Sequence, residues 1–203
     1  MTSILDTVRS LSVKLVRYEK TAQILDHWID LSDAEGAGIV PRFDPIAVPG
    51  LLPFVYLLQR NGDRLKYRVS GEEVNRLFEQ NHTGRYLDEV VPNEIYGEVA
   101  PYFFSVFDPC ICIFRGRVLL PDREYMSFER VLLPVMRNGE IQLLGTLALS
   151  STTPLRTDPE PSAAPGPGFH FTLIELESGK VETSEKNLEP LADRYRGSTA
   201  LNG

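Results

Sequence analysis

The chain has 203 residues, of which 42 % are hydrophobic and 24 % are charged, and it carries a formal net charge of −7. This composition is that of a globular chain that can bury a core without disulfides or metal ions. The acidic balance argues against nucleic acid as a partner, because neutralising phosphates requires clustered lysine and arginine.

The start of the chain has no signal-peptide pattern, and no uncharged apolar run approaches the roughly 18 residues that a membrane span needs. We therefore expect a cytoplasmic protein without membrane insertion. Residues 1–34 are predicted to form one helix, because their apolar residues recur alternately every four and every three positions. Gly36 and Gly38 are expected to end it.

Two interpretations of this helix are open. Its apolar stripe either packs against a second copy of the chain or covers the chain's own sheet. In the first case the candidate dimer interface consists of Leu11, Leu15, Tyr18, Ala22, Leu25 and Ile29.

A compact domain is predicted over residues 35–151. Asp44 suits a helix N-cap, since Pro45 follows it at a position where no N–H partner is lost. Strands are then predicted over residues 54–60 and 65–70, and the Asn61-Gly62 pair between them is a strong hairpin signal.

Short helices are predicted next. One begins at Gly71, a turn follows around Gly84, a further helical segment covers residues 86–90, and Asn93 is expected to cap a longer helix. Three strands then follow over residues 110–120, 125–136 and 141–151, with Asn138-Gly139 as a tight hairpin between the last two.

This order predicts an α+β fold, with one five-stranded antiparallel sheet and helices segregated to one face. It is unlike the repeated βαβ pattern of nucleotide-binding parallel sheets. Residues 152–168 are rich in proline and are predicted to be a linker. Residues 169–203 are interpreted as a flexible C-terminal tail, which either adds a strand to the sheet edge or binds a partner.

Several short motifs occur in a fixed order over roughly residues 26–151. They are Trp28, Phe43-Asp44-Pro45, Leu51-Leu52-Pro53, Tyr67-Arg68-Val69 running into Gly71, Thr83-Gly84-Arg85, and Leu87-Asp88-Glu89. In this order the chain resembles a family of PAS-like proteins common in alphaproteobacteria, formerly described as a domain of unknown function. The resemblance implies a PAS-like five-stranded sheet with a helical cradle.

The resemblance also implies a single-domain signalling protein. We expect it to homodimerise, to regulate a separate signalling protein, and to sense a small apolar ligand. The alternatives are a small-molecule receptor whose ligand is the main signal and an enzyme that uses the same cavity. An enzyme is not predicted, because the sequence contains no GxSxG, P-loop, HExxH or paired-carboxylate motif.

The candidate ligand pocket is formed by apolar residues from the predicted strands and helices. These residues either line a cavity or simply fill the core. They are Tyr67, Val74, Phe78, Phe103, Phe107, Phe114 and Phe128.

The polar candidates are expected to be chiefly structural. Arg68 lies on the strand face opposite Tyr67 and either faces solvent or bonds to Asp44 or Asp88. Arg85 is the second such arginine, and the glycines at 71 and 84 are interpreted as turn residues.

No cofactor and no metal site are predicted. The histidines are His27, His82 and His170, and none lies in the predicted helix 93–107, where a haem-binding PAS domain often places its ligand. Cys110 and Cys112 share one face of a strand and are expected to be buried free thiols.

Overall fold

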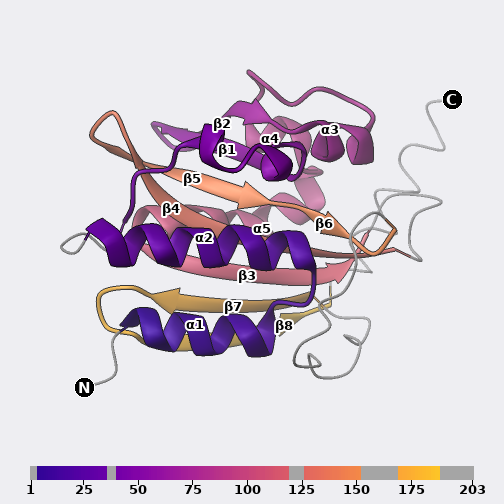
Figure 1. Ribbon diagram of the computed structural model, residues 1–203. Helices are drawn as coiled ribbons and strands as arrows, with labels where there is room; N and C mark the ends of the chain where they lie inside the picture. The colour runs from indigo at the N-terminus through magenta and orange to yellow at the C-terminus, as the bar shows by residue number, and fades with distance from the viewer. Residues whose placement is uncertain (1–3, 36–39, 119–125, 152–168, 188–203) are drawn as a thin grey trace, which may run out of the picture.

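A computed structural model of the chain describes residues 4–35, 40–118, 126–151 and 169–187. These residues form an α+β fold in three layers, with an open antiparallel sheet between two layers of helices (Figure 1). The predicted class is therefore confirmed, but the sheet is larger than predicted and its second face is also covered.

Every neighbouring pair of strands in the sheet is antiparallel, in the order β2-β1-β5-β4-β3-β7-β8, while β6 pairs with β4. The strands are β1 (Val55–Asn61), β2 (Arg64–Ser70), β3 (Cys110–Arg117), β4 (Ser127–Arg137), β5 (Glu140–Thr146), β6 (Ala148–Leu149), β7 (Phe169–Glu175) and β8 (Val181–Lys186). Both predicted hairpins occur. Positive φ angles at Gly62, Asn138 and Gly139 form their turns.

Residues 169–187, interpreted from the sequence as a flexible tail, take the first of the two roles proposed for it, since they add strands to the sheet edge. They form the hairpin β7–β8, which pairs along β3 and lengthens the sheet. The side chains of β7 alternate between the two faces of the sheet. Phe169 and Phe171 are buried in the core on one face and Ile174 in the core on the other. The predicted linker, 152–168, lies outside the described residues.

The N-terminal segment forms two helices, α1 (Ile4–Leu15) and α2 (Glu19–Glu35), rather than one. The helix is interrupted where the backbone N–H groups of Arg17 and Tyr18 donate to the carboxylate of Glu129 on β4, at 2.8 and 3.1 Å. The two helices lie side by side on one face of the sheet (Figure 1). The expected end of the helix at Gly36 and Gly38 lies outside the described residues.

The apolar stripe of this segment is used within the chain itself. Its α2 members, Ala22, Leu25 and Ile29, are buried against the sheet together with Tyr18, and the α1 members Leu11 and Leu15 are partly buried against the same core. Trp28 fixes the packing of α2, because its Nε1–H donates to the carbonyl oxygen of Pro134 on β4 at 2.7 Å. Covering the chain's own sheet is thus the interpretation that holds for α2.

The second layer of helices covers the opposite face. It comprises α3 (Glu72–Phe78), α4 (Leu87–Val90) and α5 (Asn93–Phe104). The 3₁₀ turns η1 (Pro45–Ala47) and η2 (Pro49–Phe54) precede β1 in the chain, and η3 (Ser105–Phe107) follows α5. Helices are consequently found on both faces, in contrast to the prediction of one.

Local details of these helices follow the predicted chemistry with one correction. Asp44 caps η1, because its Oδ1 accepts the N–H of Ile46 at 2.9 Å. Pro92, not Asn93, is the N-cap of α5, and Asn93 is the first helical residue. At Gly71 a Cβ atom would lie 2.3 Å from the carbonyl oxygen of Pro53, so this position requires glycine for close backbone approach. Across the described ranges, no helix is both long and apolar enough to cross a membrane.

Candidate functional site

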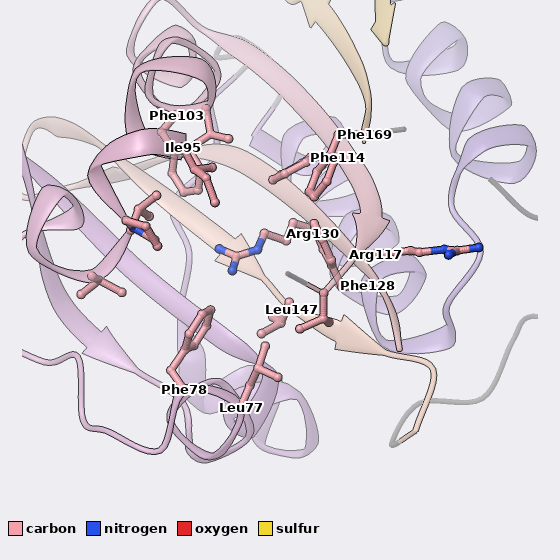
Figure 2. Close-up of a pocket in the computed structure, with 15 residues that line it drawn as sticks. Leu77, Phe78, Ile95, Phe103, Phe114, Arg117, Phe128, Arg130, Leu147 and Phe169 are labelled. Atoms are coloured by element: carbon pink, nitrogen blue, oxygen red, sulfur yellow. The ribbon is translucent and has the colours of Figure 1, made fainter. Parts of the chain in front are cut away.

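A mostly apolar pocket opens between the sheet and the α3–α5 layer (Figure 2). It holds about 750 Å³, its open mouth included. The lining residues come from α3, the end of α4 and its connection to α5, α5, β3 and the residue after it, β4, the β5–β6 connection and β7. They are Leu77, Phe78, Val90, Val91, Pro92, Ile95, Val99, Phe103, Phe114, Arg117, Val118, Phe128, Arg130, Leu147 and Phe169.

The alternation of β-strand side chains places aromatic rings on the sheet side of this pocket. Phe114 of β3 and Phe128 of β4 meet edge to face with ring centroids 5.0 Å apart. Phe171 of β7 stacks on Phe114 at 4.3 Å, and Phe169 lies 5.7 Å from both Phe114 and Phe128. The added hairpin therefore contributes to the pocket and not only to the sheet edge.

Of the predicted pocket residues, four line the pocket, namely Phe78, Phe103, Phe114 and Phe128. Tyr67 and Val74 are buried in the same core without lining the pocket. Phe107, partly buried, packs against that core without lining the pocket either. The sequence predicted that aromatic side chains form the site. It did not predict which of these rings line the pocket.

Arg130 is the charged group inside this site, and it was not among the predicted residues. It lies on β4, a strand whose residues contribute to both hydrophobic cores. Its guanidinium points into the pocket among apolar side chains (Figure 2). Its Nε is buried and has no hydrogen-bond partner within the described part of the chain. Arg117, the other arginine of the lining, is exposed and points away from the pocket.

Two tyrosines contact this guanidinium. Nη1 of Arg130 donates to the hydroxyl of Tyr56 at 3.3 Å, and the Tyr67 hydroxyl lies beside it. Burial raises the pKa of both phenols, so both are neutral hydroxyls at pH 7. Burial alone would lower the pKa of Arg130, but Tyr56 and Tyr67 raise it, so the guanidinium stays charged.

Contacts with aromatic ring faces offset part of the cost of burying the Arg130 charge. The guanidinium carbon lies 5.6 Å from the Tyr56 ring centroid, 5.8 Å from that of Phe128 and 5.9 Å from that of Phe78. Such contacts contribute from about 0.5–1 kcal/mol each at exposed sites to about 2 kcal/mol when desolvated. The effective penalty for burying an ion is several kcal/mol, so these rings offset it only in part.

Gly145 explains how Tyr56 reaches Arg130. Tyr56 on β1 is paired with Gly145 on β5, the strand that separates β1 from β4. A Cβ atom at Gly145 would lie 2.1 Å from the Tyr56 ring, so the ring crosses β5 directly over this glycine. The glycine is thus a positioning residue for the Tyr56 hydroxyl.

His82 is a further polar residue close to Arg130 and Tyr67. It is fully buried, its ring centroid is 5.3 Å from that of Tyr67 and 5.0 Å from that of Phe78, and neither ring nitrogen has a partner among the described residues. Burial, followed by the charges of Arg130 and Arg85, lowers the pKa of His82 to about 4. The imidazole is therefore neutral at pH 7 and does not balance the arginine.

The motif around residues 83–85 places His82 in this position. Gly84, with a φ of +89°, donates its N–H to the Tyr67 carbonyl oxygen at 2.8 Å, and the Tyr67 N–H donates to the Arg85 carbonyl oxygen at 2.9 Å. The Arg85 side chain donates to the Glu89 carbonyl oxygen at 2.9 Å. The turn is thus attached to β2 on one side and α4 on the other.

Asp88 pairs with Arg64 and not with Arg68, for which this pair was one of the open alternatives. Arg64 at the start of β2 donates to both carboxylate oxygens of Asp88, at 3.1 and 2.9 Å, and to Glu89 at 2.8 Å. Arg68 is exposed on β2 and takes no part in this cluster. Asp88 and Arg85 bond to neighbouring groups of the fold, which fits the structural roles expected for them. Arg68 faces solvent, which was one of its two interpretations.

Cys110 and Cys112 are both free and buried, as predicted. Burial raises the pKa of the Cys112 thiol, which opposes the thiolate form that a nucleophile requires. Within the four described ranges, no cluster of three or more histidine, cysteine, aspartate or glutamate residues could hold a metal ion.

Comparison with known proteins gave no further assignment: no protein-family model, no curated protein and no solved structure matches the chain.

Proposed function

We propose that this chain is a PAS-type sensory domain, which binds a small apolar molecule between its sheet and its helices and passes the bound state to a protein partner. The pocket beneath α3–α5 carries this proposal. Its aromatic, largely apolar lining with a single inward-pointing charged group is typical of small-molecule sites.

The order of elements around the pocket supports the same proposal. Two strands, short helices and three strands follow one another in the chain, which is the arrangement on which the PAS resemblance rests. The strands β2-β1-β5-β4-β3 are contiguous in the sheet, and α3–α5 lie between β2 and β3 in the chain.

Strand β4 offers a route by which the bound state could be transmitted. Its neighbouring residues Arg130 and Glu129 point to opposite faces, one into the pocket and the other to the start of α2. If a ligand has different affinities for two conformations of β4, its binding would therefore also change how α2 is attached to this strand. We expect such a ligand to change hydrogen exchange in α1 and α2.

The ligand-binding proposal is tested with the uncharged fluorescent probe N-phenyl-1-naphthylamine. Val91 lines the pocket and is partly buried, so Val91→Trp should fill it and weaken probe binding about tenfold or more. Val69→Trp is the matched control, because Val69 is an exposed β2 residue outside this pocket. Equal binding by both variants, or no binding by the wild type, would contradict the proposal.

The regulatory proposal includes a homodimer, and α1 is the helix that leaves apolar surface for it. Leu11, Val13 and Leu15 are partly exposed on α1, whereas the α2 part of the predicted interface is buried inside the chain. Light scattering after size-exclusion chromatography should give the mass of two chains at micromolar concentration. A single-chain mass for the wild type would exclude the dimer.

A further inference from the structure

We propose that the pocket selects apolar molecules that carry a carboxylate, and that Arg130 is the residue that binds this acid group. This inference rests on the proposed function, since it assigns a chemical class to the ligand of the same pocket. The observation behind it is a guanidinium that points into an apolar pocket and has no anionic partner among the residues that the structure describes.

The charges around Arg130 do not balance within the described part of the chain. The groups that influence its guanidinium are the hydroxyls of Tyr56 and Tyr67, and neither is an anion at pH 7. His82 lies in the same polar group and is neutral at that pH. Glu129, the next residue on β4, is directed to the opposite face and accepts its hydrogen bonds from the α1–α2 junction.

The geometry leaves Arg130 free to receive a carboxylate. Its Nε has no hydrogen-bond partner among the described residues, and its hydrogen bond to the neutral Tyr56 hydroxyl is long at 3.3 Å. Guanidinium and carboxylate groups form paired, charge-assisted hydrogen bonds, which are stronger than bonds to neutral hydroxyls. An acid group at this point would meet the Tyr56 and Tyr67 hydroxyls as additional donors.

The rest of the pocket defines the remainder of the ligand. Beyond Arg130 the walls consist of phenyl rings and aliphatic side chains, and the second arginine, Arg117, points out of the pocket (Figure 2). A molecule with one acid group and an apolar body fits this distribution. A diacid or a phosphorylated sugar would place further polar groups against apolar walls.

The experiment compares acids with alcohols of the same carbon skeleton. Hexanoate, decanoate and phenylpropanoate, and the three matching alcohols, are titrated into the full chain at pH 7 by displacement of N-phenyl-1-naphthylamine. The variants are Arg130→Met, Arg130→Lys and, as a control at an exposed arginine of β2 outside this pocket, Arg68→Met. Thermal unfolding of each variant checks that it is folded.

We expect the wild type to bind at least one acid about tenfold or more tightly than its alcohol, and Arg130→Met to lose this preference while still binding the probe. Arg130→Lys should retain part of it, and Arg68→Met all of it. Equal affinity for acids and alcohols in the wild type would overturn the inference, even if Arg130→Met did not fold. In that case probe binding would still support an apolar pocket, whereas absence of all binding would remove the proposed function itself.

Discussion

His82 and Arg130 are two residues whose burial has different chemical consequences. Both belong to residue types that normally reach water, and both are placed among aromatic rings next to Tyr67. The histidine meets this environment by giving up its proton, while the arginine cannot do so and keeps its charge. Each residue therefore makes a measurable prediction.

His82 predicts acid sensitivity of the fold. Its pKa is about 4 in the folded chain and near 6.5 in an unfolded one, so the unfolded chain binds more protons between these values. Stability should fall by about 2 kcal/mol as the pH drops from 6.5 to 4. Urea unfolding at both pH values should show this loss in the wild type and a smaller one in His82→Phe. His27→Phe is the control, and an unchanged slope in His82→Phe would contradict the assignment.

Gly145 makes a second residue-scale prediction. Because a Cβ atom at this position would lie 2.1 Å from the Tyr56 ring, Gly145→Ala must displace the ring from its place over β5. Overpacking of this kind costs about 1–3 kcal/mol, and it should also move the Tyr56 hydroxyl away from Arg130. Gly97→Ala on α5 is the control, since a Cβ there meets nothing within 4 Å. Chemical denaturation of the two variants measures the difference.

At the scale of elements, Glu129 connects the N-terminal helices to the sheet. Its carboxylate accepts the N–H groups of Arg17 and Tyr18 and the hydroxyl of Thr21, which satisfies donors at the start of α2. Burial raises the pKa of Glu129, and these hydrogen bonds oppose the rise. The carboxylate, rather than a glycine or proline, marks the boundary between α1 and α2.

Removal of this connection should therefore loosen α2. Glu129→Ala removes the acceptor of the Arg17 and Tyr18 N–H groups and should lower the free energy of unfolding by about 2–4 kcal/mol. Amide hydrogen exchange should increase at the start of α2 before it increases in β1. Glu140→Ala, at an exposed residue of β5, is the matched control. Equal stability of the two variants would show that the α1–α2 junction does not depend on the buried carboxylate.

At the scale of the whole molecule, the sheet has one hydrophobic core on each face, and β7 contributes to both. Phe169 and Phe171 belong to the core with the pocket, and Ile174 and Leu176 to the core beneath α1 and α2. Three of these residues, Phe171, Ile174 and Leu176, are at most 1 % exposed. The hairpin is therefore an integral part of the fold.

A chain that ends at residue 151 should consequently not fold. It would expose both cores along β3 and leave that strand as an unpaired, apolar edge, which favours aggregation. A chain that ends at residue 187 keeps β7 and β8 and is the control. Circular dichroism and size-exclusion chromatography of the two chains would decide, and a folded, monodisperse chain ending at 151 would contradict this account of the hairpin.

Local patterns in the sequence were sufficient for most elements of the central region. The Asn61-Gly62 and Asn138-Gly139 turns, the Asp44 cap and the alternation along β3 and β4 are properties of neighbouring residues, and each led to the observed strand or turn. The aromatic rings of the pocket could be proposed for the same reason. Arg130 could not, because an arginine in a strand gives no local sign of whether it will face water or a cavity.

The sequence by itself determined an α+β chain with two hairpins, a helical middle and an apolar N-terminal stripe, since these depend on spacing and turn chemistry within short segments. The tertiary structure decided which surface each segment would cover: α2 packs on its own sheet, residues 169–187 extend that sheet, and Arg130 points into the pocket with Tyr56 and His82 beside it. These outcomes depend on contacts between residues far apart in the chain. No local pattern encodes them, because burial is a property of the assembled layers.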